Sequence, residues 1–466
     1  PNLLEYDGPV FVIDPKGENA LNSIGYRQDV LGRKVVVLDP FNESGIANAK
    51  FNPMEFINAD NINDDCEQLA EALVMIQSKD PFWDVSARSL LAATIFYVAQ
   101  NKQESEKNLS HVYDWALIDR DEFFKKMKDE QADEAPEVKK AEQKEEPKQE
   151  NFIQTRANEQ STEKKTRKPL HPTIKHAISD VLNGAENTKA CIFSTLRTNL
   201  TFLNDDKIRE NLSGPSTFLV KDFLEGKIDV FLVLPMEKLD RYKRWLRLIL
   251  SAFMKDLLNK SIANDKKTKL FILDEFGNLG HLQALENAFT TIAGRNVILW
   301  PFIQSFQQLQ KDYPKAWRTI MGQAGHKEIF NLGDDMEAAE YISKILGKTT
   351  VLDQTISKSS GSSSSSNDKG STYGSNSGGS DTIREKEILL LQPDQIARFD
   401  TTKKIILRQG EKPVQIFKTP YFADPKLSAK WKNSLAWVMK KYPNTENFIA
   451  AEYPKAYPEI KNLKKE

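Results

Sequence analysis

The sequence of 466 residues contains few cysteines, few histidines and no long apolar run. Cys66 and Cys191 have no paired-ligand neighbours, which excludes a disulfide framework and a cysteine-based zinc site and indicates a reducing compartment. None of the five histidines has a partner at the spacing of a helical metal site. The apolar runs, such as residues 230–234, are far shorter than the ~20 residues of a membrane helix, so we expect a soluble chain.

The sequence also lacks an excess of charge of either sign. The 65 Lys and Arg residues nearly balance the 66 Asp and Glu residues, giving a net charge of −1. A polybasic protein that binds nucleic acid over its whole surface is therefore excluded, and any such contact must be local. Hydrophobic residues make up 39% of the chain, as in globular proteins, but the mean hydropathy of −0.53 indicates an unusually polar stretch.

Short apolar runs alternate with helical patterns in two parts of the chain. Residues 9–13 and 34–38 are runs rich in β-branched residues, with room between them for a crossover helix. The same alternation returns later, with strands predicted at 229–235, 270–273 and 296–302 and helices at 241–258 and 282–293. This order predicts an α/β fold with a doubly wound, mostly parallel sheet.

An inserted all-α domain is predicted at residues 58–200. Its apolar residues recur at helical spacing without a strand signal. Residues 129–168 are rich in Glu, Lys, Gln and Pro and nearly free of large apolar side chains, so we expect them to be disordered.

The α/β domain is then expected to comprise residues 1–57 and 201–425. Residues 357–381 are rich in Ser and Gly and are predicted to form a flexible loop. A strand pair is expected beyond it, at 404–408 and 413–417, followed by a C-terminal helical tail at 426–466.

The best candidate for chemistry is the acidic pair Asp274 and Glu275, which directly follows the predicted strand 270–273. Ligands bind at the carboxyl ends of strands in such sheets. In nucleoside triphosphatases, an aspartate there holds Mg²⁺ and a neighbouring glutamate orients or deprotonates the attacking water. The alternative is a strand end with two solvated acids, and the pair alone does not decide between them.

The phosphate-binding motif GxxxxGK[ST] is absent from the sequence. The tempting match at residues 347–349 fails because its first glycine would fall on Ile342, and Gly347 is better explained as a helix stop.

Two weaker signals accompany the acidic pair. Asp14, Lys16 and Glu18 surround a glycine turn at the end of the first predicted strand, where a generic turn is the alternative. Arg295 precedes the predicted strand 296–302 and Gln304 follows it. The glutamine is a candidate γ-phosphate sensor and the arginine a candidate contact to a neighbouring subunit's nucleotide, the alternative being an ordinary polar strand end and a surface arginine.

Residues 241–247 interleave basic and aromatic side chains. An amphipathic helix with a solvated basic face explains this pattern better than a nucleic-acid contact does.

Several segments, taken in order, resemble the TraG/TraD-type coupling proteins of type IV secretion and conjugation, which are hexameric RecA-like ATPases related to the FtsK and HerA pumps. They extend over most of the chain, and their order and spacing make the combination specific. The matching segments are VIDPKGE at 12–18, YR at 26–27, GRKVVVLDP at 32–40, FNP at 51–53, FW at 82–83, AR at 87–88, LL at 90–91, LDEFGNL at 273–279, GR at 294–295, IQS at 303–305, QL at 308–309, Tyr313, Ser343, LG at 346–347 and PYF at 420–422.

The resemblance implies a RecA-like motor domain that binds ATP and Mg²⁺ and carries the all-α domain as an insertion. Asp274 and Glu275 then take the Walker B roles, with Asp274 on the metal, Gln304 that of a sensor and Arg295 that of a subunit-interface residue. Asp14, Lys16 and Glu18 match the DPKGE signature and are assigned to the cofactor site. The implied activity is ATP-driven pumping of single-stranded DNA with its relaxase, or of effector proteins, into the secretion channel.

Family members carry two transmembrane helices and the phosphate loop ahead of a segment like residues 1–4. We therefore expect this chain to be a fragment that neither anchors in a membrane nor binds triphosphate normally. The complete protein is expected to be a homo-hexameric ATP hydrolase at the cytoplasmic face of the bacterial inner membrane. The alternative is a truncated, non-hydrolysing paralogue that acts as a cargo-docking adaptor.

Overall fold

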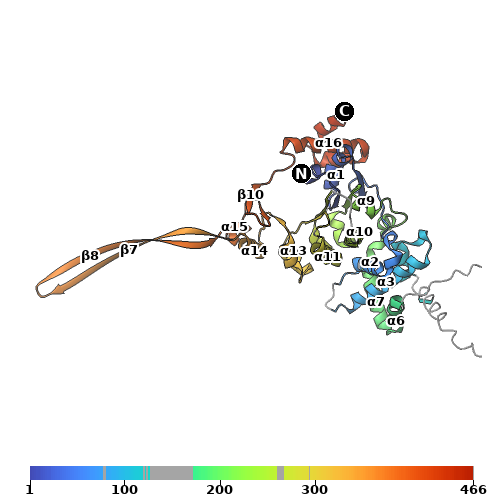
Figure 1. The fold of residues 1–466 in the computed structure, drawn as a ribbon, viewed down its shortest axis with the longest axis horizontal. Coiled ribbons are helices and arrows are strands. Elements are labelled where there is room, and N and C mark those ends of the chain that lie inside the picture. The colour runs from blue at the N-terminus through green and yellow to red at the C-terminus, as the bar shows by residue number, and fades with distance from the viewer. Residues whose placement is uncertain are drawn as a thin grey trace, which may run out of the picture. The chain divides into compact units, whose positions relative to one another are not determined.

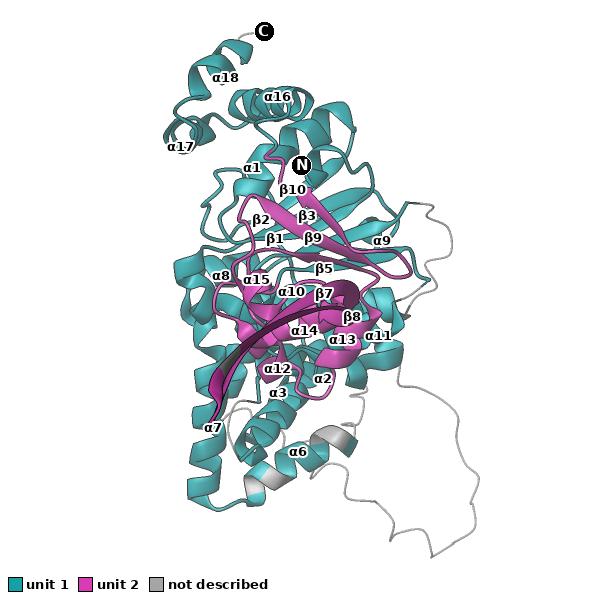
Figure 2. Ribbon diagram, turned by 90° about the vertical axis from the view of Figure 1, so that its left-hand side faces the viewer, with its two compact units in different colours: residues 1–302, 421–466 teal, residues 303–420 magenta. Residues whose placement is uncertain are grey.

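The computed structural model describes residues 1–76, 80–118, 121, 124–125, 172–259, 267–292 and 294–464. The chain forms two compact units, one of residues 1–302 with 421–466 and one of residues 303–420 (Figures 1 and 2). We call them unit 1 and unit 2. The stretch 129–168, expected to be disordered, lies outside the described residues.

Unit 1 is built on a five-stranded sheet in the order β2-β3-β1-β4-β5, in which every pair of neighbours is parallel. The strands are β1 (Val10–Asp14), β2 (Lys34–Leu38), β3 (Ile228–Val233), β4 (Lys269–Leu273) and β5 (Val297–Pro301). All five lie within two residues of the predicted runs. The apolar, β-branched composition of these runs suits strands covered on both faces.

Helices cover both faces of this sheet, which confirms the doubly wound fold. On one face, Val10 and Val12 pack in a core with α1 (Glu18–Gly25) and α16 (Pro425–Lys441). On the other face, the Phe11 ring lies 4.8 Å from that of Phe253, measured between centroids, on α10 (Met236–Asn259). Successive residues of β1 thus point to opposite helical layers, as the period of a strand requires.

The C-terminal helices belong to the core of unit 1 and do not form a separate tail. They are α16, α17 (Glu446–Glu452) and α18 (Tyr457–Leu463), and α16 lies against α1 (Figure 2). Trp431 of α16 is 5% exposed, and its indole N–H donates to Asn22 Oδ1 at 2.6 Å. A Cβ added at Gly25 would lie 2.2 Å from the Ser434 carbonyl oxygen, so only glycine permits this close approach.

Between residues 58 and 200, the described part of the chain is helical and contains no strand. In the described residues, the α-helices of this insertion are α2 (Ile62–Leu73), α3 (Phe82–Asn101), α4 (Leu109–Tyr113), α6 (Pro172–Asn183) and α7 (Glu186–Leu200), and α8 (Asp206–Asn211) and α9 (Val220–Leu224) lead back to the sheet. The helix α3 packs against α2, α6 and α7, and α2 also packs against α10 of the sheet layer.

Unit 2 divides the stretch 201–425, which was expected to be one continuous part of the α/β domain. It contains an antiparallel sheet in the order β10-β9-β6, and its β9–β10 pair confirms the predicted strand pair. Its strands are β6 (His326–Ile329), β9 (Lys403–Arg408) and β10 (Val414–Phe417), and its helices are α12 (Phe306–Asp312), α13 (Trp317–Gln323), α14 (Met336–Leu346) and α15 (Pro393–Ala397).

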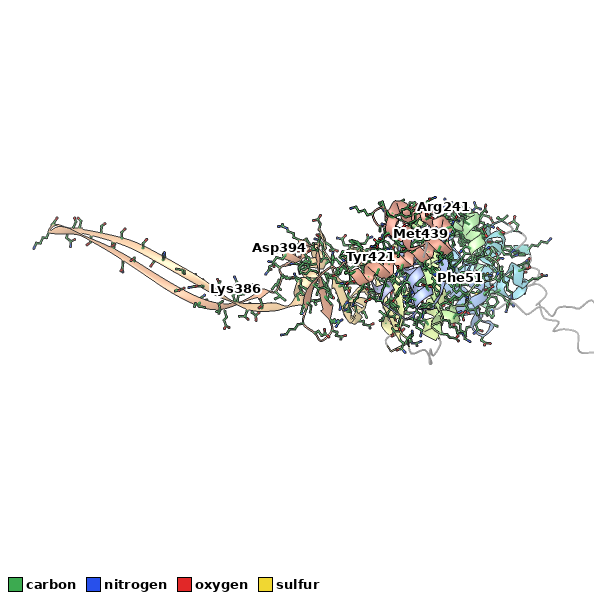
Figure 3. All side chains as sticks on the ribbon, turned by 90° about the horizontal axis from the view of Figure 1, so that it is seen from above. Phe51, Arg241, Lys386, Asp394, Tyr421 and Met439 are labelled. Atoms are coloured by element: carbon green, nitrogen blue, oxygen red, sulfur yellow. The ribbon has the colours of Figure 1, made fainter. Side chains whose placement is uncertain are left out.

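The expected loop at 357–381 is instead part of a two-stranded antiparallel ribbon. The strands β7 (Lys348–Asn367) and β8 (Gly370–Leu389) pair without a break, and their residues are largely exposed. Side chains, among them Lys386, stand out along this ribbon (Figure 3). Pairing between the two strands satisfies the backbone hydrogen bonds without burying apolar side chains. The Ser/Gly-rich sequence therefore lacks the alternation of apolar and polar residues that predicts a strand.

Within the described residues, no helix is both long and apolar enough to cross a bilayer.

Candidate functional site

The carboxyl edge of the unit 1 sheet brings two of the predicted site segments together. Ile13 of β1 pairs with Leu273 of β4, so the residues that follow them, Asp14 and Asp274, occupy adjacent positions at this edge. We call Asp14, Asp274 and the adjoining Glu275 the acidic edge. The prediction placed both segments at strand ends, and their neighbourhood follows because β1 and β4 are neighbours in a parallel sheet.

Asp14 is 1% exposed and holds the start of α1. Its Oδ2 accepts the Ala20 N–H at 2.8 Å and its Oδ1 accepts the Asn19 N–H at 3.3 Å. Gly17, with φ of 71°, allows the tight turn between β1 and α1. Burial raises the pKa of Asp14 to about 7, against the lowering effect of the two N–H donors.

Asp274 and Glu275 form a strained turn at the end of β4. Glu275 has φ of 54° and ψ of 37°, a left-handed conformation that is unfavourable by about 1 kcal/mol for a residue with a side chain. Burial raises the pKa of Asp274, although the Glu275 N–H donates to its Oδ1 at 3.0 Å and Lys16 also favours its charged form. The Glu275 Oε2 accepts from the Asn278 amide at 2.9 Å. Strain of this kind is typical of functional sites.

Lys16 and Glu18 flank the acidic edge from the turn between β1 and α1. Their charged groups lie 3.6 Å apart, and the Lys16 side chain is 69% exposed. Lys16 is close enough to lower the pKa of Asp274. A cation therefore stands beside the acidic edge and can approach an anionic ligand there.

Arg295 is not part of this arrangement. Arg295 precedes β5 and so lies at the amino edge of the sheet, where its Nη1 donates to the carbonyl oxygens of Leu257 and Leu258 at 2.9 and 2.7 Å. These bonds cap the end of α10, where the helix dipole favours a cation. Gln304 is the second residue of unit 2 and stays a predicted sensor.

Sequence reasoning missed a buried ion cluster at the amino edge of the sheet. Asp229 in β3 accepts from Arg27 Nε at 2.6 Å and from Arg33 Nε at 2.7 Å. Both Asp229 and Arg27 have fully buried side chains. The available signal was Asp229 itself, because a carboxylate within a buried apolar strand requires a cationic partner.

The solvated basic face expected for α10 is correct for Arg241, which is exposed, but not for Arg244 and Arg247. Arg247 is 1% exposed, and Arg244 is partly buried, so that burial lowers its pKa. Both donate to carbonyl oxygens at the end of α2. The apolar side of the helix is as predicted, with Trp245 fully buried.

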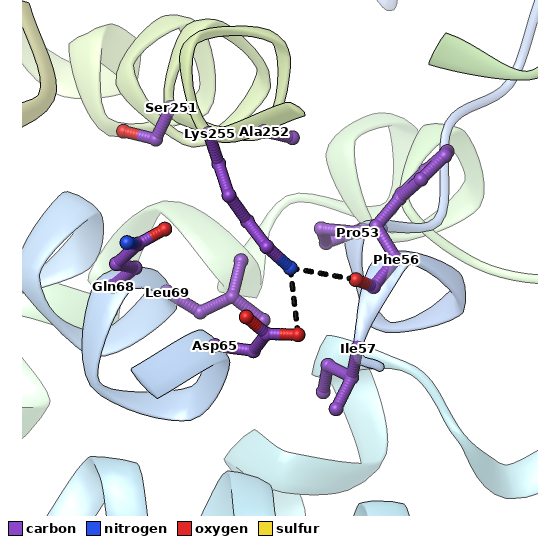
Figure 4. Close-up of a pocket in the computed structure, with 9 residues that line it drawn as sticks. All are labelled: Pro53, Phe56, Ile57, Asp65, Gln68, Leu69, Ser251, Ala252 and Lys255. Atoms are coloured by element: carbon purple, nitrogen blue, oxygen red, sulfur yellow. Dashed lines mark hydrogen bonds and ion pairs between the residues drawn. The ribbon is translucent and has the colours of Figure 1, made fainter. Parts of the chain in front are cut away.

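Two cavities lie apart from the predicted site residues. One, of about 20 Å³, lies beside the Lys255 ammonium, which bonds Asp65 Oδ2 at 2.6 Å and the Phe56 carbonyl at 2.9 Å (Figure 4). This volume holds about one water molecule, and the ion pair is internally satisfied. The other, of about 760 Å³, is bordered by α2, α3 and α6. The described residues contain no group of three or more His, Cys, Asp or Glu able to hold a metal.

Comparison with known proteins gives one consistent result. The family described as type IV secretory system conjugative DNA transfer matches residues 1–445. The chain belongs to this family. The match covers the sheet, the helical insertion, all of unit 2 and α16, so the resemblance seen in the sequence motifs is confirmed over both units.

Similar curated coupling proteins share low but extended identity with the chain. It is 24% identical over 453 residues to the type IV secretion system-coupling protein VirD4 of Bartonella henselae, covering 95% of this chain and 63% of that protein. It is 24% identical over 447 residues to the conjugal transfer protein TraG of Rhizobium radiobacter, covering 92% of this chain and 60% of that protein. The chain thus spans about three fifths of the length of these relatives.

Solved structures of the coupling protein TrwB share the fold. The unbound form superposes with a TM-score of 0.55 at 15% identity, covering 88% of this chain and 84% of that one. A TrwB complex with ADP and Mg²⁺ gives 0.55 at 13% identity, covering 90% and 86%.

Proposed function

We propose that this coupling protein works as an ATP-driven motor whose hydrolytic residues lie on the acidic edge. The observation that carries the proposal is the placement of Asp274 and Glu275 at the carboxyl end of β4, beside Asp14 and Lys16. The raised pKa values of Asp14 and Asp274 show that nearby cations do not fully compensate their burial. A metal ion bound to the phosphates of a nucleotide would supply that missing positive charge.

The residues fit a Mg²⁺ ion shared with a nucleotide. Mg²⁺ in such sites is held by one or two carboxylates together with phosphates and waters, and so does not need three protein ligands. Asp274 would hold the ion, which would polarise the transferred phosphoryl group and neutralise its charge. That TrwB has been solved with ADP and Mg²⁺ supports a nucleotide as the ligand class.

The side chains at and beside the acidic edge would have separate roles in hydrolysis. Glu275 directly follows the metal-binding candidate, and its bond to Asn278 orients its carboxylate. A carboxylate so placed would accept a proton from the attacking water. Lys16 would attract the phosphate charge, and Asp14 would keep the turn that carries Lys16 in place through its bonds to α1.

The partial exposure of β5 suggests where the phosphate-binding loop would lie. Four of the five residues of β5 are partly exposed and Ile298 is 48% exposed, whereas β1 is wholly buried. An apolar parallel strand is normally covered on both sides. We infer that a further strand pairs there and brings phosphate-binding amides to the carboxyl edge, with β5 between them and β4.

We propose partners that are consistent with membership of this family. The relatives named for conjugal transfer and type IV secretion support single-stranded DNA with its relaxase, or effector proteins, as cargo, and the secretion channel as the destination. A homo-hexamer at the cytoplasmic face of the bacterial inner membrane, anchored by further helices, would deliver that cargo. Gln304 would sense the nucleotide within the ring, whereas Arg295, whose Nη1 bonds the end of α10, would at most contact a neighbouring subunit.

Replacement of the proposed base tests the motor. In protein that hydrolyses ATP, Glu275→Gln should lower ATP turnover by about 10³-fold, the range of a lost general base. ATP affinity should change by less than about threefold, because the amide keeps the size and one acceptor of the carboxylate. The control is Glu210→Gln, a change at an exposed surface residue. Normal turnover by the Glu275→Gln protein would refute the assignment.

The alternative is a cargo-docking adaptor that does not hydrolyse ATP. Sequencing the coding DNA ahead of Pro1 separates the two functions. An in-frame strand, phosphate loop and helix would support the motor, and their absence together with unmeasurable ATP binding would support the adaptor.

A further inference from the structure

Arg247 joins two segments of unit 1 that are distant in sequence. On α2, its Nε donates to the carbonyl oxygen of Ala72 at 3.0 Å. Beyond the acidic edge, its Nη1 donates to the carbonyl oxygens of Leu279 and His281, both at 2.7 Å. A single buried guanidinium thus holds the end of the helical insertion's first long helix and the loop that follows Glu275.

The end of α2 depends on a set of arginines for its last carbonyl groups. Arg244 Nε donates to Leu73 at 3.0 Å and Arg88 Nη2 donates to Val74 at 2.9 Å, next to the bond from Arg247 to Ala72. The final carbonyls of a helix lack partners within it, and the helix dipole favours cations there. Of these three arginines, Arg247 is the one whose bonds also reach the loop after Glu275.

The loop side of this link is tightly packed. The 3₁₀ helix η8 (Phe276–Leu279) begins directly after Glu275 and leads into Gly280, which lies between the two carbonyls that Arg247 holds. Gly280 has φ of 66°, and a Cβ added there would lie 2.8 Å from Met75 Cε, just beyond α2. The loop and the end of α2 therefore meet at two adjacent points.

We propose that Arg247 is a positioning residue that fixes the loop 275–282 to the end of α2 and so couples the acidic edge to the helical insertion. It acts through Glu275, whose strained turn is the first part of this loop. A shift of α2, as when a partner binds the insertion, would be passed through Arg247 to the catalytic carboxylate. The inference rests on the proposed function for its catalytic consequence, whereas the link itself is independent of it.

Lysine cannot replace this arginine in the link. The planar guanidinium presents donors in several directions at once, whereas the ammonium of lysine is a single compact point on a flexible stem. Arg247→Lys keeps the charge and most of the apolar stem but cannot reach both segments. Arg244→Lys is the matched control, because Arg244 lies on the same helix and also caps α2 but bonds Asn199 on α7 on its other side.

Hydrogen exchange on the present chain tests the link without any need for ATP. In Arg247→Lys, the amides of both 70–76 and 275–282 should exchange at least about tenfold faster than in the wild-type chain. In Arg244→Lys, only 70–76 should change, with 275–282 within about twofold. Unchanged protection of 275–282 in Arg247→Lys, or loss of protection in both segments in Arg244→Lys, would overturn the proposal.

A second variant covers the case in which Arg247→Lys does not fold. Gly280→Ala introduces a Cβ against Met75 and should loosen both segments in the same way. Because φ at Gly280 is 66°, alanine is also strained there whatever space Met75 leaves, so the clash and the backbone strain act on the link together. Loosening of only one segment in Gly280→Ala would count against the link.

Turnover measurements separate this inference from the proposed function. In protein that hydrolyses ATP, Arg247→Lys should lower kcat at least about tenfold with KM within about threefold, whereas Arg244→Lys should keep kcat within about twofold. Equal losses in the two variants would indicate a purely structural role and overturn the positioning role. If the wild-type protein does not hydrolyse ATP, the proposed function fails, and hydrogen exchange still decides the link.

Discussion

The two edges of the unit 1 sheet differ in whether their buried carboxylates are paired with cations. At the amino edge, Asp229 is bonded at both oxygens, by Arg27 and Arg33. At the carboxyl edge, Asp14 and Asp274 lie side by side, and burial raises the pKa of each. Both edges use carboxylates at strand ends, but only one pairs them fully with cations.

This difference separates charge that stabilises the fold from charge that is available for chemistry. Removal of one partner of a buried ion pair strongly destabilises the fold, because it leaves an uncompensated buried charge. A carboxylate with a raised pKa keeps its affinity for a proton or a metal ion, which is the behaviour expected of a catalytic site. The three predictions below test the contrast, from the largest expected effect to the smallest.

The amino edge should be the more sensitive to loss of its carboxylate. Asp229→Ala leaves Arg27 buried without its ion-pair partner, and we expect the free energy of unfolding to fall by about 3–5 kcal/mol. Chemical denaturation of the present chain measures this change. The control, Glu210→Ala, removes an exposed ion pair with Lys50 and should leave the midpoint unchanged. A loss below about 1 kcal/mol for Asp229→Ala would remove the contrast between the edges.

The carboxyl edge should instead show a dependence on pH. The pKa of Asp14 is about 7 in the folded chain and 3.8 as its ordinary value. The folded state therefore binds the proton more tightly, so this contribution to stability is complete below pH ~4 and is lost as the pH rises through 7. Asp14→Asn removes this dependence, and its stability relative to wild type should rise by about 2–4 kcal/mol between pH 4 and pH 8.

A carboxylate with the opposite shift provides the control for Asp14. The pKa of Glu446 is lowered to about 2 by its hydrogen bond with Lys464, so its contribution to stability is lost only as the pH falls below about 4.5. Glu446→Gln should therefore leave the slope between pH 5 and pH 8 as in wild type. If Asp14→Asn keeps the wild-type slope in that window, Asp14 is not the group responsible.

The sequence was most informative where one residue pattern determines a structure. The bounds of the parallel strands were predicted within two residues because short, continuous apolar runs are typical of strands buried on both faces. The acidic edge followed from the same runs, since the carboxyl ends of parallel strands share one side of the sheet. The ribbon of β7 and β8 was missed because its Ser- and Gly-rich strands bury no face and so leave no alternation.

The remaining differences depend on contacts between distant segments. The burial of Arg247 depends on the end of α2 and on the loop after Glu275, which are far from it in sequence. Arg295 was predicted from its place before a strand, but its bonds are to the end of α10. In each case, an arginine that was expected to face solvent or a ligand instead donates hydrogen bonds to main-chain carbonyl oxygens. No local sequence pattern predicts such partners.

The smallest expected effect concerns backbone strain at the two edges. Glu275 at the carboxyl edge and Asn296 at the amino edge have nearly the same left-handed conformation, with φ of 54° and 53°. Asparagine tolerates this conformation better than glutamate does. Glu275→Gly should therefore stabilise the chain by about 0.5–1 kcal/mol, whereas Asn296→Gly should change stability by less than about 0.5 kcal/mol, both measured by chemical denaturation.

A gain in stability at residue 275 that abolishes turnover would show that the strain is retained for function, since a glutamate is kept where glycine fits better. Equal gains at the two positions would mean that the carboxyl edge holds no more strain than the amino edge. The contrast between the edges would then rest on their charges alone, with Asp14 and Asp274 carrying it rather than the turn at Glu275.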